Sequence, residues 1–326
     1  MNPVHPQTLF ILMPGEVAVK RNSGKEDLPR WFSYPLEKIY AKICFSRRFR
    51  DFIYHRKPKA FLIFNVSFVE VLVALLFGRS SPIYSIYQWI PFEYLPWYKR
   101  VAYRLVLSRS RVIVVYNSIA EIYIRKFFPT AKVVFQRLWV DTEWFSPLLA
   151  RMENADDEPY ILCPGSHRRN EHLVIEISRK LNMKVIRFSQ DRQTIEFYQK
   201  HNTENVVFMH DIDFQQMRTL YAGARLVINP VDDTLIPAGI TCLIEALSMN
   251  CSVVTPGGHS SCGYCDASGQ QPFFSVPPLS DVDVWVDMCR RVLDHELRPP
   301  VSPRNFAVRY CSPESALVSW NTLIQE

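Results

Sequence analysis

Short apolar runs alternate with longer amphipathic stretches along the 326 residues, and the alternation occurs in both halves of the chain. Apolar runs rich in Val and Ile are typical of parallel strands covered on both faces, and the stretches between them have the spacing of helices. The pattern predicts strands at 8–13, 60–64, 83–87, 111–116, 133–135, 160–163, 184–188, 205–208, 225–229 and 273–276. It predicts helices at 35–55, 66–77, 98–107, 119–127, 171–181, 193–201, 214–222, 281–295 and 312–325.

This alternation predicts the fold class, an α/β protein with two Rossmann-like doubly wound domains. The stretch 150–159 is polar, acidic and without periodicity, so we place the domain boundary there. One domain then covers 1–150 and the second begins at 151. Domains of this kind face each other across a cleft, and we expect a ligand in that cleft.

The composition narrows the class of protein. Hydrophobic residues make up 48% and charged residues 21%, which is enough to build a large core and argues against disorder. The apolar run at 68–77 contains Glu70 and is shorter than the roughly 18 residues of a membrane span, so we expect no transmembrane helix. The first residues have no basic stretch followed by a long apolar one, so we expect no secretory signal.

Several of the eight cysteines lie inside apolar runs, for example Cys163 and Cys251. Free cysteines of this kind are typical of a reducing compartment, and we expect a cytoplasmic protein. Cys262 and Cys265 follow His259 at a spacing that resembles half of a metal site. No second pair has matching spacing, and the neighbours are Ser, Gly and Asp, so we expect a loop and no bound metal.

Charge is distributed unevenly between the two halves. Residues 1–150 hold 22 Lys and Arg against 10 Asp and Glu, whereas 151–326 hold 16 against 22. The basic half also carries aromatic residues beside cations, a combination that favours an anionic membrane surface. We expect the acceptor or membrane side of the protein there, and the candidate residues are Arg47, Arg48, Arg50, Trp89 and Trp97. No nucleic-acid module is recognisable, and the alternatives are a solvated surface for the charges and a core role for the aromatics.

The segment 236–258 carries the clearest chemical signal. Gly239 lies in a loop, and Ile240 and Thr241 open an apolar helix that contains one acid, Glu245. A strand follows and ends in a Pro-Gly-Gly turn at 256–258. A helix N-terminus at the carboxyl end of a strand binds phosphate, and the acid could accept hydrogen bonds from a ribose or pair with an arginine of the protein.

A second turn, at Gly165, follows the strand at 160–163 and precedes a helix. Arg168 and Arg169 come directly after it, and guanidinium groups neutralise phosphate through paired donors. The alternative for this turn is ordinary: surface arginines near a helix start, with Ser166 or Asn170 capping the helix.

The order of these motifs resembles glycosyltransferase family 4 and its relatives, which have the GT-B fold. The stretch 138–147, Leu-Trp-Val-Asp-Thr-Glu-Trp-Phe-Ser-Pro, is similar to the linker between the two domains of that family. The turns at 256–258 and 276–278 are similar to the turns that follow the donor-binding helix. The resemblance implies a donor domain at 151–310 and a final helix at 311–326 that crosses back to the first domain.

The resemblance also implies roles for individual residues. Glu245 matches the second acid of the family's Glu-x7-Glu signature, which binds the donor ribose, and Pro237 stands where the first acid is expected. Asp232 or Asp233 is a candidate substitute for that acid. Gly165 matches the glycine of the donor-phosphate motif, and Arg168 and Arg169 are the cations nearest to it. Glu171 lies near the position of the motif's lysine.

The function that the resemblance implies is transfer of a sugar from a UDP- or GDP-type nucleotide-sugar donor to a glycan or lipid-linked acceptor. Such an enzyme is retaining and metal-independent, requires no cofactor and works in the cytoplasm, with attachment to the inner face of a membrane as an open question. A non-catalytic nucleotide-sugar binder of the same fold is the alternative, and Pro237 is the residue that favours it. No catalytic residue, donor sugar or oligomeric state is assigned.

Overall fold

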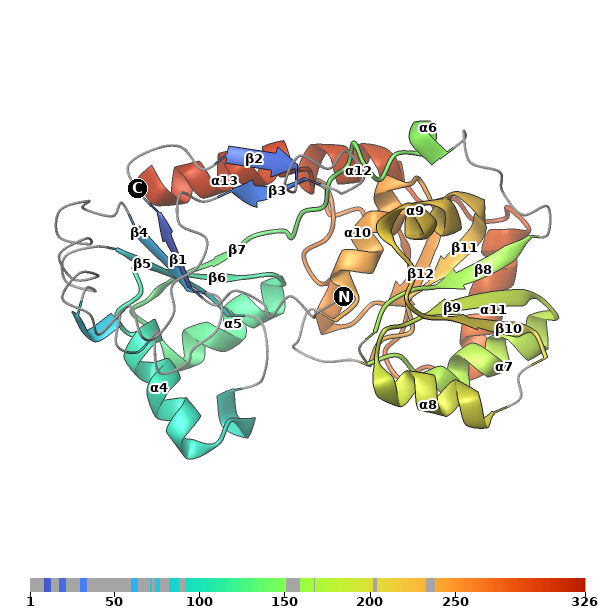
Figure 1. Ribbon diagram of the computed structural model, residues 1–326, viewed down its shortest axis with the longest axis horizontal. Helices are drawn as coiled ribbons and strands as arrows, with labels where there is room; N and C mark the ends of the chain where they lie inside the picture. Colours follow the sequence, from blue (N-terminus) through green and yellow to red (C-terminus); the bar gives the residue numbers. More distant parts are fainter. Residues whose placement is uncertain are drawn as a thin grey trace. The chain divides into compact units, whose positions relative to one another are not determined.

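The computed structural model describes residues 9–12, 18–21, 30–33, 60–63, 71, 74–76, 82–87, 92–150, 159–166, 168–201, 204–232 and 238–325. The contacts of the chain divide it into two compact units. The first consists of Met1–Lys20, Trp31–Gln136 and Leu317–Glu326, and the second of Arg21–Arg30 and Arg137–Ala316. Each unit is built on a sheet of mostly parallel strands (Figure 1).

The sheet of the first unit has five strands in the order β1-β4-β5-β6-β7. Only β1 runs antiparallel, paired with β4, and the other neighbours are parallel. The strands are β1 (Leu9–Leu12), β4 (Ala60–Ile63), β5 (Ile83–Ile86), β6 (Val112–Val115) and β7 (Lys132–Phe135). A separate two-stranded sheet consists of β2 (Ala18–Arg21) and β3 (Arg30–Ser33).

Two helices of the first unit follow from clear local signals. Helix α5 (Ser118–Phe127) begins at Asn117, whose side chain accepts a hydrogen bond from the Ala120 N–H at 2.5 Å. Helix α4 (Trp97–Leu107) follows a short 3-10 helix, η2 (Phe92–Tyr94). Val106 and Leu107 at the end of α4 are buried, whereas Trp97 at its first position is 72% exposed.

The sheet of the second unit has six strands, all parallel, in the order β10-β9-β8-β11-β12-β13. This order reverses direction between β8 and β11, as in a doubly wound sheet. The strands are β8 (Tyr160–Cys163), β9 (Lys184–Phe188), β10 (Val206–Met209), β11 (Ala224–Ile228), β12 (Val253–Pro256) and β13 (Phe274–Val276).

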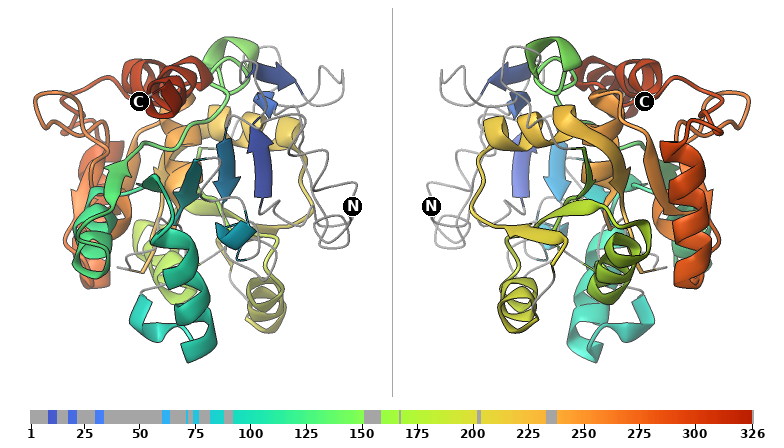
Figure 2. Two further views of the ribbon diagram at one scale, coloured as in Figure 1. Left: turned by 90° about the vertical axis from the view of Figure 1, so that its left-hand side faces the viewer. Right: turned by 90° about the vertical axis from the view of Figure 1, so that its right-hand side faces the viewer.

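Helices cover both faces of this sheet. Figure 1 shows α9 and α10 on one side and α7 and α8 on the other, and Figure 2 views the same unit from the side in its right-hand panel. Helix α11 packs against α7, and their apolar side chains form one core with the strands. The bounds are α6 (Pro147–Ala150), α7 (Glu171–Leu181), α8 (Arg192–Lys200), α9 (Phe214–Gly223), α10 (Ile240–Ser248), α11 (Val282–Leu293), α12 (Pro303–Tyr310) and α13 (Pro313–Gln325), with a 3-10 helix η3 (His259–Ser261).

One arginine joins the segment before α6 to helices α10 and α12 of the same unit. Arg304 on α12 donates from Nη1 to the carbonyl oxygens of Thr142 and Phe145, both at 2.7 Å, and to Ser248 at 2.6 Å. The Ser248 hydroxyl also donates to the Phe145 carbonyl at 2.7 Å. Because Ser248 ends α10, the segment, α10 and α12 form one packed assembly.

The described elements agree closely with the pattern-based predictions, and the exceptions have a physical reason. Helix α7 and strands β8 and β9 have the predicted bounds. Helix α12 was not predicted, and three prolines, at 299, 300 and 303, surround its start. The local signal was nevertheless present, since Ser302 caps α12 and Pro303 occupies its first position. Strands β2 and β3 were also not predicted, and the predicted helix at 35–55 lies outside the described residues.

Candidate functional site

Two turns meet at the carboxyl ends of β8 and β11, where the strand order of the second unit reverses. The first follows β8 and begins at Gly165, and the second lies between β11 and α10 and ends at Gly239. The Asn170 N–H donates to the Pro230 carbonyl at 3.0 Å, and the Asp232 N–H donates to the Arg168 carbonyl at 3.2 Å. Arg169 and Val231 also form a β-bridge. The reversal point of a parallel sheet is where such folds bind ligands, because neighbouring loops diverge there. The chain therefore brings together Gly165 and the loop leading to α10.

The turn after β8 depends on the glycine that the sequence indicated. Gly165 has a φ of +104°, which residues with a Cβ rarely adopt. A Cβ at this position would lie 2.3 Å from Nη2 of Arg169 and 2.9 Å from Sγ of Cys242. The turn thus lies directly against the first turn of α10. Among the described residues, the peptide N–H groups of Gly165 and Ser166 donate to no protein acceptor.

The two predicted arginines differ in their surroundings. Arg169 folds back over the turn and donates to the Pro164 carbonyl from Nε at 3.1 Å and from Nη2 at 2.8 Å. Arg168 is exposed and has a positive φ of 54°. Asn170 caps α7 by accepting from the Leu173 N–H at 3.0 Å, so the alternative reading of this residue as a cap is confirmed. Ser166 instead accepts from the Gln190 N–H at 2.9 Å.

The second turn begins α10 at Gly239, which has a φ of +75°. No side chain caps this helix, and its first intrahelical bond runs from the Leu243 N–H to the Gly239 carbonyl at 2.9 Å. Within the part of the chain that the structure describes, the N–H groups of Ile240, Thr241 and Cys242 therefore have no acceptor. Unpaired N–H groups and the helix dipole make such an end attractive to an anion.

Asn229 holds the second turn from below. Its side chain is 2% exposed and donates from Nδ2 to Thr255 Oγ1 at 3.2 Å and to the Gly239 carbonyl at 3.5 Å. A Cβ on Gly239 would lie 2.5 Å from Oδ1 of Asn229 and 2.9 Å from Cγ1 of Val231. Only glycine therefore satisfies both the backbone conformation and the packing at 239.

Glu245 lies one turn further along α10 and is 6% exposed. Its Oε2 accepts a hydrogen bond from the hydroxyl of Tyr221 at 2.8 Å. Burial raises the pKa of this carboxyl to about 7, although the hydrogen bond from Tyr221 acts in the opposite direction. Tyr221 is a partner for the acid that sequence reasoning did not identify, and the ribose-binding role of Glu245 stays a prediction.

A buried ion pair beneath the Gly165 turn was also not predicted. Arg187 on β9 has no exposed surface, and its Nε and Nη2 donate to the carboxylate of Glu171 at 2.9 and 2.6 Å. Tyr198 donates to the same carboxylate at 3.0 Å. A signal was available, because an arginine inside an apolar strand covered on both faces requires a partner. Glu171, the residue near the family's lysine position, is that partner.

The remaining predicted residues separate into two groups. Trp97 lies on α4 of the first unit, at its exposed start. Pro237, the position of the missing signature acid, lies outside the described residues, as do Arg47, Arg48, Arg50, Trp89 and Asp233. Asp232 is described and exposed.

The loop with Cys262 and Cys265 is attached to the segment that leads out of β7. Arg137 donates to the carbonyl oxygens of Gly263 at 3.2 Å and Cys265 at 2.8 Å, and the buried Tyr264 hydroxyl accepts from the Leu138 N–H at 3.0 Å. Both cysteines are free thiols. The described residues contain no group of three or more His, Cys, Asp or Glu side chains placed to hold a metal ion.

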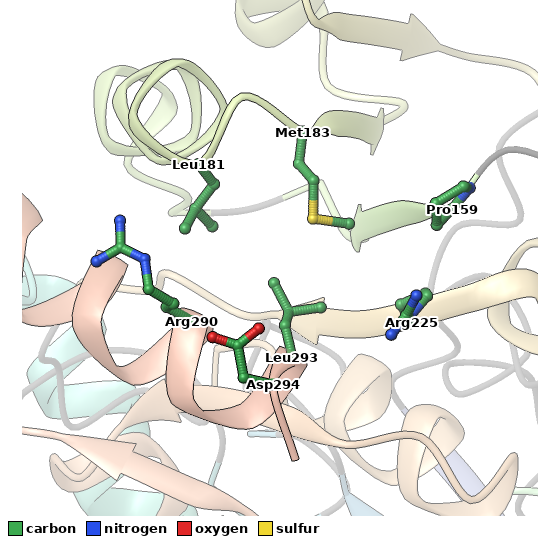
Figure 3. A pocket seen from close by; sticks show the side chains of 7 residues that line it. All are labelled: Pro159, Leu181, Met183, Arg225, Arg290, Leu293 and Asp294. Carbon is green, nitrogen blue, oxygen red and sulfur yellow. The ribbon is translucent and has the colours of Figure 1, made fainter. Parts of the chain in front are cut away.

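Two pockets lie at opposite ends of the strands in the six-stranded sheet. The larger, about 360 Å³, is at the amino ends of β8, β9 and β11, between the last residues of α7 and α11 (Figure 3). Leu181, Met183 and Leu293 line it, and Arg225 and Arg290 lie at its sides. Two helix C-termini meet there, and such ends attract cations, so the arginines complement the fold. A smaller pocket of about 60 Å³ touches Asn170, Pro230, Pro256 and Pro277, at the carboxyl ends where the two turns lie.

Comparisons with known proteins agree on the fold. No family model matches the chain, and no curated protein matches it significantly. Among solved structures, sucrose-phosphate synthase from Thermosynechococcus elongatus is similar over 97% of this chain and 87% of its own, with 14% identity and a TM-score of 0.68. A glycosyltransferase from Rickettsia africae matches over 87% and 80%, with 10% identity and a TM-score of 0.67. HepE from Anabaena, in complex with UDP, matches over 81% and 79%, with 13% identity and a TM-score of 0.65.

These similarities show that the chain has the GT-B fold of glycosyltransferases, as predicted. The described helices include none with the length and apolar character needed to span a membrane.

We predict that Gly239→Ala destabilises the protein more than Gly269→Ala. Gly269 has a similar φ of +83° but open space around its Cβ position, so alanine there adds only backbone strain, about 1 kcal/mol. At 239 the methyl group must also displace Asn229, and we expect a loss of about 3 kcal/mol. Urea unfolding of both variants measures the difference. An equal loss in the free energy of unfolding for both variants would show that packing around Gly239 does not contribute to stability.

We predict a pH dependence of stability that comes from Glu245. Its carboxyl ionises near pH 4.5 when unfolded and near pH 7 when folded, so the unfolded chain loses the proton first. The free energy of unfolding therefore falls as pH rises from about 4.5 to about 7, by on the order of 3 kcal/mol. Glu245→Gln should remove this fall and exceed the wild-type protein in stability above pH 7. Urea unfolding between pH 5 and 8 tests it, with the exposed Glu204→Gln as control.

Proposed function

We propose that the protein is a glycosyltransferase that transfers a sugar from a nucleotide-diphosphate donor bound at the two turns of the second unit. The observation that carries the proposal is the meeting of two sets of N–H groups, at 165–166 and 240–242, at the point where the strand order reverses. None of these groups donates to an acceptor among the residues that the structure describes. A diphosphate has the charge and the number of acceptor oxygens to use both sets at once. Glu245 lies within the same helix, at the distance of about one turn that a ribose attached to the diphosphate requires.

UDP is the first donor nucleotide to test, with GDP second. HepE, which shares the fold, has been solved with UDP and with UDP-glucose. At 13% identity this similarity supports the fold alone. The choice of UDP as the donor nucleotide is therefore part of our proposal.

The chemical task is to stabilise the diphosphate as it leaves while the sugar meets an acceptor hydroxyl. Helix and turn N–H groups aimed at the phosphates act as fixed dipoles that need no reorganisation during the reaction. Arg168 is exposed beside the turn and can add a guanidinium. We propose a retaining reaction without a metal ion and without a protein nucleophile.

We assign the acceptor to the domain 1–150, most of which belongs to the first unit, and the donor to the domain 151–310, with 311–326 as the helix that returns to the first domain. The basic balance of 1–150 fits an acceptor at an anionic surface, such as a lipid-linked glycan at the inner face of a membrane. The end of η2 and the start of α4 support this assignment, because Tyr94, Trp97 and Tyr98 are 79%, 72% and 56% exposed beside Lys99 and Arg100. Aromatic rings and cations in one place are typical of membrane interfaces.

A second candidate function is nucleotide-sugar binding without catalysis. The observation that favours it is Pro237, which replaces the acid that the family resemblance places next to the transferred sugar. Both candidates require the donor nucleotide to bind, and only the enzyme releases or transfers the sugar.

We predict that Glu245→Ala weakens nucleotide binding by tenfold or more, because a ribose hydroxyl pair loses its carboxyl acceptor. UDP- and GDP-sugars are screened by thermal stabilisation of the wild-type protein, and the affinity of the best is then measured by calorimetry. Glu204→Ala is the control, since Glu204 is exposed. Unchanged affinity in Glu245→Ala would remove the ribose role.

An assay with the nucleotide sugar that binds best distinguishes the enzyme from the non-catalytic binder. Release of sugar from the bound donor, or its transfer to any acceptor, supports the enzyme. Tight binding with no release from any donor, with or without acceptors, would leave only the non-catalytic function.

We predict that the first unit binds anionic membranes. Sedimentation with vesicles of phosphatidylglycerol and phosphatidylcholine should fall several-fold when Trp97 is replaced by Ala or when Arg47, Arg48 and Arg50 are reversed in charge. Leu279→Ala is the control, because Leu279 is 92% exposed on the second unit. Equal sedimentation of all variants would contradict the membrane assignment.

A further inference from the structure

We infer that Arg187 is a positioning residue for donor binding, because its buried guanidinium holds the Gly165 turn with the N–H groups directed toward the diphosphate. This inference rests on the proposed function and extends it to a residue that makes no contact with the donor. Arg187 is the fourth residue of β9, the strand next to β8 in the sheet.

The nitrogen atoms of the Arg187 guanidinium donate to two kinds of acceptor, a carboxylate and backbone carbonyl groups. Nε and Nη2 donate to the two carboxylate oxygens of Glu171, at the first position of α7. Nη1 donates to the carbonyl oxygens of Gly165 at 2.6 Å and Cys163 at 3.2 Å, and also to that of Phe188. One buried cation thus joins the end of β8, the turn after it and the start of α7.

The hydrogen bond to the Gly165 carbonyl sets the direction of the next N–H group. In a planar trans peptide the C=O and the following N–H point in opposite directions. Because the Gly165 carbonyl points toward Arg187 in the interior, the Ser166 N–H points away from it. This is one of the N–H groups that donate to no acceptor among the described residues. Arg187 therefore controls the orientation of a group that is available to a phosphate.

Electrostatics supports the same role. Glu171 alone would place a negative charge beside the proposed diphosphate site and weaken anion binding. The paired donors of Arg187 neutralise it, and the Tyr198 hydroxyl gives it a further hydrogen bond. The pair keeps the local charge balanced while the carbonyl contacts hold the turn.

A double replacement separates positioning from simple stability. Removing one member of a buried ion pair leaves an uncompensated charge and destabilises a protein, whereas replacing both with apolar residues is often tolerated. Arg187→Met alone should therefore lower the melting temperature strongly, and Arg187→Met with Glu171→Leu should recover most of the loss. The double variant still lacks the bonds to Gly165 and Cys163, so we expect its affinity for UDP or GDP to stay at least tenfold below wild type.

The matched control is a second ion pair on α7. Glu176 and Arg179 pair at 2.6 Å, but their side chains are 39% and 67% exposed. Arg179→Met with Glu176→Leu removes the same charges and should leave nucleotide affinity unchanged. Hydrogen exchange at Gln190 and Asp232, whose N–H groups donate to Ser166 and Arg168 of the turn, should quicken only in the Arg187 double variant.

The outcomes are distinct. Wild-type affinity in a stable Arg187 double variant would overturn the positioning role and leave the proposed function intact. Absence of nucleotide binding by the wild-type protein would overturn the proposed function, and this inference with it. Weak binding with recovered stability and faster exchange at Gln190 and Asp232 supports the role.

Discussion

The buried guanidinium of Arg187 is the interaction on which the geometry of the candidate site depends. It lies inside a strand covered by helices on both faces, where an unpaired charge would be strongly unfavourable. Glu171 supplies the countercharge, and the carbonyl groups around Gly165 use the remaining donors. The need to satisfy one charge therefore determines the shape of the turn that faces the carboxyl edge of the sheet.

The second turn, at Gly239, is held by neutral side chains, whereas the Gly165 turn is held by a charged one. Asn229 and Thr255 hydrogen-bond to each other at the ends of β11 and β12, and Asn229 lies against the Gly239 position. Gly165 lies against Cys242 of α10, so the two turns pack on each other. The packing holds the N–H groups of both turns in place without a ligand, and within the described part of the chain these groups donate to no acceptor. Preorganised donors of this kind can bind an anion without further ordering of the chain.

The chain thus combines a fold shared with glycosyltransferases with a site that departs from the family pattern at specific positions. Glu171 lies near the position where the resemblance implies a lysine, and Pro237 lies where it implies an acid. The structure pairs Glu171 with the buried Arg187, so the negative charge at this position is neutralised within the protein. Position 237 lies outside the described residues, so the consequence of the second departure rests on the transfer assay.

Local sequence determined the parts of this protein whose physics is local. Apolar runs indicated the strands, Asn170 indicated a helix start, and Gly165 and Gly239 indicated turns, because each effect acts within a few residues. The partners of buried polar groups were decided only by the tertiary structure. Arg187 and Glu171 are 16 residues apart, and Tyr221 and Glu245 are 24 apart, so no local pattern pairs them. Packing of helices on the sheet brings such groups together, and the cost of an unpaired buried charge then selects which of them bond.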